Sequence, residues 1–281
     1  MIHASNRAGG RPLAGVIGDP IAHSKSPRMH RFWLDQLGID GHYVPLHVKD
    51  GDLEAVLRAM PKMGFVGTNV TIPHKETAIK LADEISSAAR AIGAANTLTF
   101  GADGRIHADN TDAYGFLANL RQQAPGWAPD GPALLLGAGG AARAVIAALQ
   151  EAGVGDIRLC NRTRARAEDL ASAFGAGVSV LPWEDTGDAV GDCSLLVNTT
   201  SLGMVGKPSL DLALDKLSAS TIVSDLVYVP LDTGLLRAAK DKGCTTVDGL
   251  GMLLHQGVPG FERWFGARPE VTPALREALL A

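Results

Sequence analysis

The stretch that decides the fold is Leu134-Leu135-Leu136-Gly137-Ala138-Gly139-Gly140-Ala141-Ala142-Arg143. An apolar run of strand length leads into a glycine-rich loop, and an alanine-rich helical segment follows it. In such a loop Gly137 permits the tight turn, Gly139 lets backbone amides approach a pyrophosphate, and the small side chain of Ala142 allows close helix–strand packing. The helix that follows offers unpaired N–H groups and the positive end of its dipole to phosphates. The motif therefore predicts a Rossmann-type unit that binds a dinucleotide.

The residues after the second strand of this unit indicate which dinucleotide binds. The strand ends at Cys160, and Asn161-Arg162-Thr163-Arg164-Ala165-Arg166 follows it. An NAD enzyme has an acid here for the ribose 2′-hydroxyl, whereas an NADP enzyme has arginine for the 2′-phosphate. A solvated helix start is the alternative interpretation, but cations at a helix N-terminus oppose its dipole. Because Arg162 and Arg166 suit bidentate contacts to phosphate, the loop predicts NADP.

Apolar runs alternate with helical segments along most of the chain, which favours βαβ units and a mainly parallel sheet. The helical segments expected between the strands include His74–Ala82 and Glu84–Ile92. The Pro- and Gly-rich stretch 124–132 is typical of a linker or boundary loop. Two amphipathic segments, Leu250–Phe265 and Pro273–Leu280, predict helices at the C-terminal end. The predicted class is therefore α/β, and 281 residues favour about two domains.

Composition excludes several kinds of partner. The formal net charge is −4 and no basic block occurs, which argues against nucleic acid as the main ligand. No run approaches the roughly 18 apolar residues of a membrane helix, and residues 1–11 lack the apolar stretch of a signal peptide. The three cysteines form neither a CxxC pair nor a disulfide framework, which predicts a reduced, cytoplasmic protein. Glycine accounts for 33 of the 281 residues, which exceeds its average share of about 7%.

Three unusually polar stretches follow predicted strands in the first half of the chain. They are residues 18–27, Asn69–Lys75 and Asp109–Asp112, with Asn96 just upstream of the last. Ligands of open α/β sheets bind beyond the carboxyl ends of strands, so these stretches predict one polar site. Each residue also has a structural interpretation: Ser26 and Asp112 as helix caps, Lys75 as a surface lysine, and His23 and His74 as orienting or surface histidines. No histidine pair has metal-ligand spacing with a carboxylate, so no metal is expected.

Together these stretches resemble the motifs of the shikimate dehydrogenase family, which occur in the same order from about Leu13 to the end. The matches include Asn69–Lys75, Asp109–Asp112, Asn161-Arg162-Thr163 and Asp248-Gly249-Leu250-Gly251-Met252-Leu253. The resemblance implies reversible NADPH-dependent reduction of 3-dehydroshikimate to shikimate, in the pathway to aromatic amino acids. It implies a substrate domain of residues 1–111 and 247–281, and a doubly wound NADP domain of residues 112–246.

The resemblance also implies a role for each matching residue. Lys75 corresponds to the catalytic lysine and Asp112 to its acidic partner. Substrate contacts are implied for Ser24, Ser26, Asn69, Thr71, Asn96, Asp112, Tyr228 and Gln256. Cofactor contacts are implied for Gly137, Ala138, Gly139, Gly140, Ala141, Asn161, Arg162, Thr163, Arg166, Leu226 and Gly249.

Two residues depart from the family pattern. Thr199 stands where many members have alanine, and Leu226 stands where methionine often lines the nicotinamide pocket. Two other functions are compatible with the sequence: a quinate or dual quinate/shikimate dehydrogenase, and a non-catalytic NADP-binding sensor. The expected partner is a small-molecule substrate, and the expected state is a monomer or a homodimer.

Overall fold

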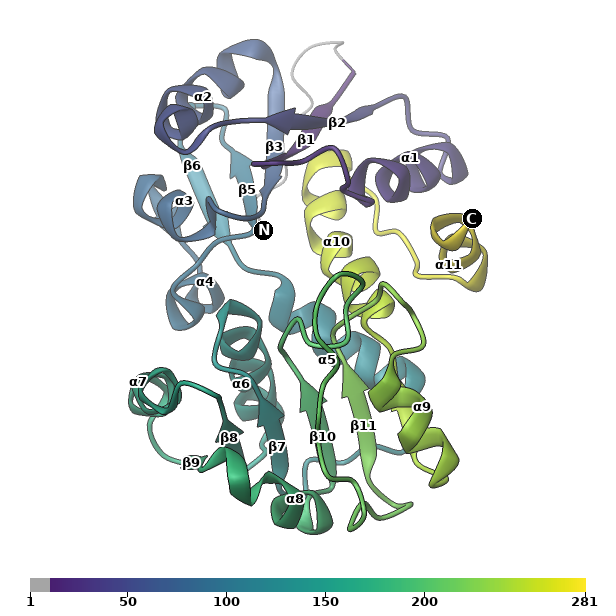
Figure 1. Cartoon of the computed structure of the whole chain (residues 1–281). Helices are drawn as coiled ribbons and strands as arrows, with labels where there is room; N and C mark the ends of the chain where they lie inside the picture. Colours follow the sequence, from purple (N-terminus) through teal and green to yellow (C-terminus); the bar gives the residue numbers. More distant parts are fainter. Residues whose placement is uncertain (1–10) are drawn as a thin grey trace. The chain divides into compact units, whose positions relative to one another are not determined.

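A computed structural model describes residues 11–281. Their chain divides into two compact units, drawn in Figure 1. The first unit runs to Thr111 and resumes at Leu254–Ala281, and the second is Asp112–Leu253. None of the helices in the described part of the chain combines the length and apolar composition needed to cross a bilayer.

The first unit is built on a six-stranded mixed sheet, in the order β2-β1-β3-β5-β6-β4. Strands β1, β2 and β3 pair in parallel, whereas β5 pairs antiparallel with both β3 and β6. Its elements are β1 (Leu13–Gly18), α1 (Ser26–Gln36), β2 (His42–His47), a 3-10 turn at Asp50–Asp52, α2 (Leu53–Ala59), a 3-10 turn at Met60–Met63, β3 (Phe65–Val70), α3 (Lys75–Leu81), β4 (Glu84–Ile85), α4 (Ser87–Ile92), β5 (Thr97–Phe100), β6 (Ile106–Asp109) and α11 (Pro273–Leu280), with the last part of α10 (Gly249–Phe265).

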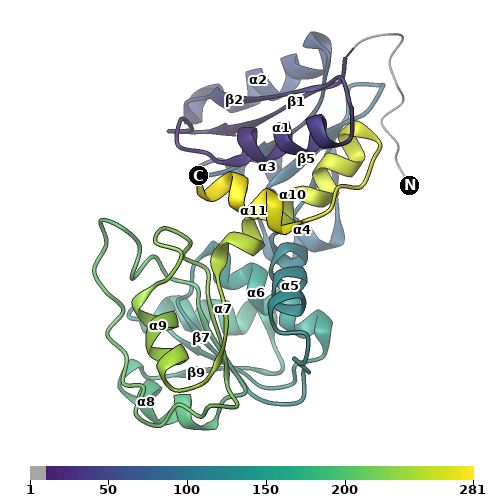
Figure 2. The same ribbon diagram turned by 90° about the vertical axis from the view of Figure 1, so that its right-hand side faces the viewer.

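Strand alternation decides which helices cover each face of this sheet. On β1, Ile17 faces a core formed with Leu57 of α2 and Ala78 of α3. Its neighbour Val16 points the opposite way, to a cluster with Trp264 of α10. The C-terminal helix α11 lies beside the start of α1 (Figure 2), where Lys25 Nζ donates to the Leu279 carbonyl at 2.6 Å.

The second unit has an all-parallel sheet in the order β12-β11-β10-β7-β8-β9, with every neighbouring pair in parallel register. Numbered from β7, this is the 3-2-1-4-5-6 order of the doubly wound dinucleotide fold, and its strand order reverses between β7 and β10. Its elements are α5 (Asp112–Gln123), β7 (Ala133–Leu136), α6 (Gly140–Ala152), β8 (Ile157–Cys160), α7 (Arg164–Phe174), β9 (Val178–Leu181), a 3-10 turn at Trp183–Asp185, α8 (Thr186–Ala189), a 3-10 turn at Val190–Asp192, β10 (Leu195–Asn198), β11 (Ile222–Asp225), α9 (Gly234–Asp241) and β12 (Thr245–Val247), with the first part of α10.

The predicted α/β class and the doubly wound parallel sheet are confirmed, and so are the two C-terminal helices. Two expectations are wrong in detail. The segment Glu84–Ile92 is not one helix, because Glu84–Ile85 pairs in parallel with β6 before α4 begins. The stretch 124–132 is not a domain linker, because it joins α5 to β7 inside the second unit.

Candidate active site

The glycine-rich loop of the second unit has the geometry of a phosphate-binding turn. It leaves β7 at Leu136 through Gly137, whose φ is +107°, and α6 begins at Gly140. A Cβ atom on Gly137 would lie 2.7 Å from Thr199 Oγ1, so only glycine fits there. A Cβ atom on Gly139 or Gly140 would meet no atom within 4 Å, so the front of the turn is open. The exposed N–H groups at the start of α6 can therefore be approached by an anion.

The threonine that departs from the family pattern joins this loop to the neighbouring strand. Thr199 directly follows β10, and its hydroxyl donates to the Leu136 carbonyl at 2.7 Å. That bond lies between β7 and β10, where the strand order reverses. The hydroxyl thus stabilises the carboxyl ends of these two central strands, where doubly wound folds bind their ligand.

Leu226, expected near the nicotinamide, and Gly249, expected to contact the cofactor, lie against each other. The Leu226 N–H donates to the Asn198 carbonyl at 3.0 Å, and a Cβ atom on Gly249 would lie 2.2 Å from the Leu226 carbonyl oxygen. Asp225, which was not predicted as a site residue, holds the segment that carries Leu226 against the end of β10. Its carboxylate accepts from Asn198 Nδ2 at 2.9 Å and from the Val227 N–H at 3.0 Å. Burial raises the pKa of Asp225, and these hydrogen bonds oppose that shift.

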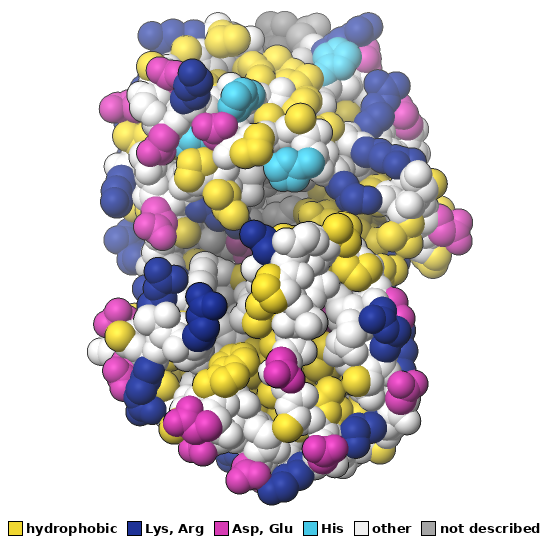
Figure 3. Space-filling model, in the orientation of Figure 1, with side chains coloured by type: hydrophobic (Ala, Val, Ile, Leu, Met, Phe, Trp, Pro, Cys, Tyr) yellow, Lys and Arg dark blue, Asp and Glu magenta, His cyan; other side chains and the backbone are white. Residues whose placement is uncertain are grey.

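The arginine-bearing loop between β8 and α7 is exposed, and only part of its charge is paired. Arg164 forms an ion pair with Glu168 at 2.7 Å, one helical turn along α7. Arg162 and Arg166 form no ion pair with another residue of the described chain. On the face shown in Figure 3, basic side chains gather over α7 and the start of α6. This surface suits a phosphate group on a bound nucleotide.

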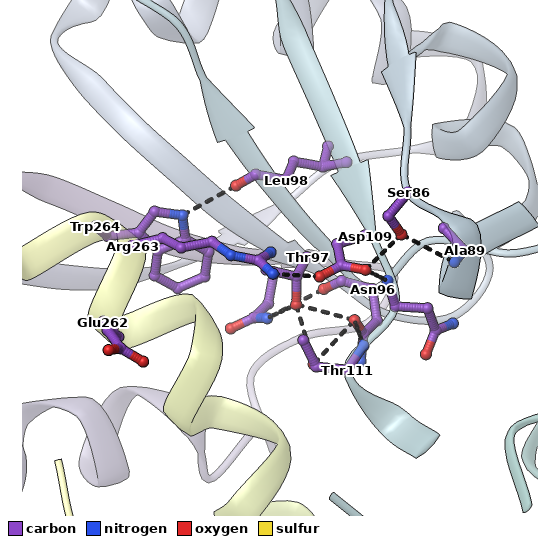
Figure 4. A network of polar contacts seen from close by, with 12 residues as sticks. Ser86, Ala89, Asn96, Thr97, Leu98, Asp109, Thr111, Glu262, Arg263 and Trp264 are labelled. Carbon is purple, nitrogen blue, oxygen red and sulfur yellow. Dashed lines mark hydrogen bonds and ion pairs between the residues drawn. The ribbon is translucent and has the colours of Figure 1, made fainter. Parts of the chain in front are cut away.

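Two of the polar stretches of the first unit, Asn69–Lys75 and Asp109–Asp112, meet with Asn96 in one hydrogen-bond network, part of which Figure 4 shows. Asn69 lies on β3, and its side chain reaches the start of β5. There its Nδ2 donates to the Asn96 carbonyl at 3.0 Å and to Thr97 Oγ1 at 3.1 Å. Asn96 Oδ1 accepts from Thr97 Oγ1 at 2.9 Å and from the Thr111 N–H at 2.9 Å. Asn96 Nδ2 donates to Gln256 Oε1 of α10 at 3.2 Å. The structure therefore brings together three predicted substrate residues that are far apart in sequence.

Lys75 is held by its backbone at the start of α3. Its carbonyl accepts from the Ala95 N–H at 2.9 Å, which joins it to the segment leading into Asn96. The preceding His74 is fully buried and contacts the Val48 carbonyl through Nε2 at 2.7 Å. His74 therefore orients this loop, as one of the two interpretations of its sequence predicted. Thr71 is half-buried, and its N–H donates to the Ile17 carbonyl at 2.9 Å.

The loop before α1 orients two serines through its backbone. The Ser26 N–H donates to Ser24 Oγ at 3.3 Å, and the Ser24 N–H donates to the Ile21 carbonyl at 3.0 Å. Ser26 is buried and is the first residue of α1, whose N-cap is Lys25 and has no side-chain capping bond. Ser26 therefore does not cap α1, and that interpretation of the serine is wrong.

Helix α10 is fastened to the strands that carry these polar residues. Trp264 Nε1 donates to the Leu98 carbonyl at 3.0 Å, and Arg263 pairs with Asp109 of β6 at 2.5 Å (Figure 4). Burial would raise the pKa of Asp109, but the hydrogen bond from Ser86 and the charge of Arg263 lower it below its ordinary value. No local pattern predicts the Arg263–Asp109 pair, because 154 residues separate its members.

Asp112 and Tyr228 belong to the second unit. Asp112 opens α5, and Tyr228 is half-buried with a pKa raised by burial. Their roles in substrate binding remain predictions. Within residues 11–281, no three His, Cys, Asp or Glu side chains gather in a set that could hold a metal ion.

One unit has a 3-2-1-4-5-6 parallel sheet with an open glycine-rich turn, and the same chain carries another α/β unit with a polar network. These features define the class of dinucleotide-dependent dehydrogenases. Comparison with known families gives three matches in chain order. Residues 16–98 match the shikimate dehydrogenase substrate binding domain, residues 121–226 match shikimate / quinate 5-dehydrogenase, and residues 249–280 match the shikimate 5′-dehydrogenase C-terminal domain. The chain belongs to the shikimate dehydrogenase family.

Individual relatives agree with this assignment over nearly the whole chain. Shikimate dehydrogenase (NADP(+)) of Roseobacter denitrificans is 66% identical over 270 residues, which cover 96% of this chain and 98% of that protein. The solved structure of Thermus thermophilus shikimate 5-dehydrogenase in complex with NADP(H) and shikimate is 40% identical, with a TM-score of 0.85, and the match covers 96% and 98% of the two chains. Quinate dehydrogenase of Corynebacterium glutamicum in complex with NAD is 31% identical, with a TM-score of 0.90, and the match covers 96% and 99%.

Proposed function

We propose that this chain is an NADP-dependent shikimate dehydrogenase, an oxidoreductase that reversibly reduces the ketone of 3-dehydroshikimate to the CH–OH group of shikimate. The observation that carries the proposal is the joining of Asn69, Asn96 and Gln256 in one network of the first unit. These are three of the positions that the family resemblance assigns to the hydroxyls of the substrate ring. The 66% identity to an enzyme of that name supports the same activity.

The second unit fits NADP. Gly137 and the open turn at Gly139 and Gly140 would receive the pyrophosphate, and Arg162 and Arg166 would hold the 2′-phosphate. The loop has no acid that would favour the free 2′-hydroxyl of NAD. When bound, the nicotinamide supplies the hydride for ketone reduction. We propose contacts to the same cofactor for Ala138, Ala141, Asn161, Thr163, Leu226 and Gly249.

Lys75 is the residue we propose for proton transfer. Its ammonium group would donate a hydrogen bond to the substrate carbonyl oxygen and stabilise the negative charge that develops there during reduction. Transfer of one proton from Nζ to this oxygen gives the alcohol, and in the oxidation direction Nζ takes the proton back. We propose that Asp112 orients the lysine and accepts from a substrate hydroxyl.

The remaining substrate contacts divide according to the chemistry of the side chains. We propose that the hydroxyls of Ser24 and Ser26 bind the substrate carboxylate, because two donors can share its two oxygens. Amide and hydroxyl groups suit the ring hydroxyls, because each can donate or accept. These groups are Asn69, Thr71, Asn96, Asp112, Tyr228 and Gln256.

Absorbance of NADPH provides the test. Purified protein is mixed with shikimate and NADP, and the rate of NADPH formation is compared with the rates for quinate and for NAD. The proposal requires NADP-dependent oxidation of shikimate. A preference for quinate with NAD would instead identify a quinate dehydrogenase, to which the chain is also similar. Tight NADP binding without turnover on either substrate would identify a non-catalytic sensor.

We propose the functional boundaries as residues 1–111 with 247–281 for substrate, and 112–246 for NADP. The units of the structure meet at Thr111/Asp112 and at Leu253/Leu254, inside α10. We further propose a monomer or homodimer that works in the cytoplasm on small molecules, consistent with three buried, unpaired cysteines. Analytical ultracentrifugation measures the oligomeric state.

A further inference from the structure

Tyr43 of β2 lies in the first unit next to Asn69, one of the residues proposed to bind substrate. Its side chain is buried, and its ring stacks on His30 with centroids 3.8 Å apart and planes 4° apart. Trp264 of α10 contacts the same pair, at 6.1 Å from the Tyr43 ring. The Tyr43 ring is therefore packed against His30 on one face, with Trp264 beside the stacked pair, and its phenol oxygen reaches Asn69.

The direction of each hydrogen bond at this phenol follows from a backbone carbonyl. The Asn96 carbonyl can only accept, so the Asn69 atom 3.0 Å from it is the amide nitrogen. The Asn69 oxygen, Oδ1, therefore faces Tyr43, and the Tyr43 hydroxyl donates its proton to Oδ1 at 2.7 Å. The orientation of the Asn69 amide is thus fixed from both ends.

We propose that Tyr43 is a positioning residue of the substrate site: its hydroxyl holds Asn69 so that Asn69 presents a carbonyl oxygen to a hydroxyl of the substrate. This inference rests on the proposed function. Nothing in the family resemblance assigned a role to Tyr43.

The hydrogen-bonding capacity of Asn69 determines what it can offer. An asparagine amide has two N–H donors and two acceptor positions on its oxygen. Both donors are used, by the Asn96 carbonyl and by Thr97 Oγ1, and Tyr43 uses one acceptor position. The remaining acceptor position can take a hydrogen bond only from a donor, such as a ring hydroxyl. Asn69 therefore selects for a free hydroxyl and against an ether, a ketone or a hydrogen atom at the position it faces.

The protonation state of Tyr43 agrees with this role. Burial raises the pKa of Tyr43 well above its ordinary value, and a hydrogen bond with Ser26 partly opposes the shift. The phenol therefore keeps its proton and remains a donor to Asn69 throughout the neutral range.

The test compares Tyr43→Phe with His30→Phe. Both substitutions alter the same stacked pair, but only Tyr43→Phe removes the hydroxyl. For Tyr43→Phe we expect the KM for shikimate to rise about tenfold, the effect of one buried hydrogen bond, with kcat within about threefold of the parent and the KM for NADP unchanged. For His30→Phe we expect all three constants to stay near the parent values. A second substrate is a shikimate analogue methylated on the hydroxyl that donates to Asn69. Its KM should exceed that of shikimate in the parent protein, and the two KM values should become similar in Tyr43→Phe.

A second measurement keeps this inference separate from the proposed activity. The side-chain amide resonances of Asn69, observed with 15N-labelled protein, should shift in Tyr43→Phe and remain in place in His30→Phe. An unchanged Asn69 signal and an unchanged KM for shikimate in Tyr43→Phe would overturn the inference while leaving the proposed function intact. An equal rise in KM for both variants would also overturn it, because packing rather than the hydroxyl would then be responsible. Absence of shikimate oxidation by the parent protein would overturn the proposed function, while the Asn69 signals would still report the Tyr43 contact.

Discussion

Replacing His30 by phenylalanine should make the protein less sensitive to acid. His30 is fully buried on α1, and neither of its ring nitrogens has a hydrogen-bond partner among residues 11–281. It packs between the rings of Trp33, Tyr43 and Phe261, with no charged group in that aromatic cluster. Burial lowers its pKa from 6.5 to about 3. A phenylalanine keeps a ring in this space and removes the titrating group.

The size of the effect follows from proton linkage. Below pH 6.5 the unfolded chain binds a proton at His30, whereas the folded chain does not until pH falls to about 3. Stability is therefore full above pH 6.5 and is lost as pH falls through that window, by about 1.4 kcal/mol per pH unit. At pH 5, about 1.5 units below the unfolded pKa, the loss due to His30 is about 2 kcal/mol.

Urea unfolding followed by tryptophan fluorescence at pH 7 and pH 5 measures this difference. We expect the parent to lose about 2 kcal/mol more than His30→Phe between the two pH values, whichever variant is more stable at pH 7. His255, whose pKa is lowered to about 4 by burial and by the charge of Arg276, titrates in both proteins, so its contribution cancels. Equal losses for parent and variant would show that His30 takes up its proton in the folded state, and the linkage argument would fail.

Three further substitutions test the site and its support. Lys75→Ala should lower kcat by about 100-fold or more while the KM for NADP stays near the parent value, because proton transfer is lost and the nucleotide unit is untouched; steady-state kinetics measure both, and near-parent turnover would remove Lys75 from this role. Arg166→Ala should raise the KM for NADP about tenfold or more and leave that for NAD unchanged, whereas Arg164→Ala, which loses only an ion pair within α7, should change neither; equal effects of Arg166→Ala on the two cofactors would contradict the 2′-phosphate contact. Arg263→Met should lower the free energy of unfolding by about 1–2 kcal/mol, because a half-buried aspartate loses a charged donor, whereas Arg268→Met, which breaks an exposed ion pair near the same helix end, should cost less than about 0.5 kcal/mol; similar losses in urea unfolding would show that burial of the pair is irrelevant.

Local sequence patterns were sufficient to predict most of the fold, because strand and helix periods are local. The turn at Gly137 and the parallel sheet around it follow from a ten-residue stretch. The two-residue strand Glu84–Ile85 was missed, because its identity depends on pairing with β6 and no periodicity exists over two residues. The antiparallel pairing of β5 with β3 was also missed, because the direction of a strand depends on the connection between strands and not on its own residues.

The candidate site divides in the same way. The residues expected to touch ligands could be recognised because they interrupt apolar strands or follow them directly, as Asn69 does at the end of β3. The residues that hold them in place carry no such signal. Tyr43 is one more apolar ring in an extended segment, and Asp225 is one acid at the end of a strand. Their importance arises from contacts across strands and helices, which only the three-dimensional structure shows.

Close approach between elements requires glycine at three positions of the first unit. A Cβ atom on Gly67 of β3 would lie 2.0 Å from Trp264 Nε1, and one on Gly257 of α10 would lie 2.4 Å from Met29. A Cβ atom on Gly260 would lie 2.9 Å from the ring of Trp264. These glycines let α10 lie directly against the sheet and α1, which brings Gln256 within hydrogen-bond distance of Asn96. Helix α10 therefore contributes Gln256 to the first unit's site, because glycines where α10 packs allow the close approach that this contact needs.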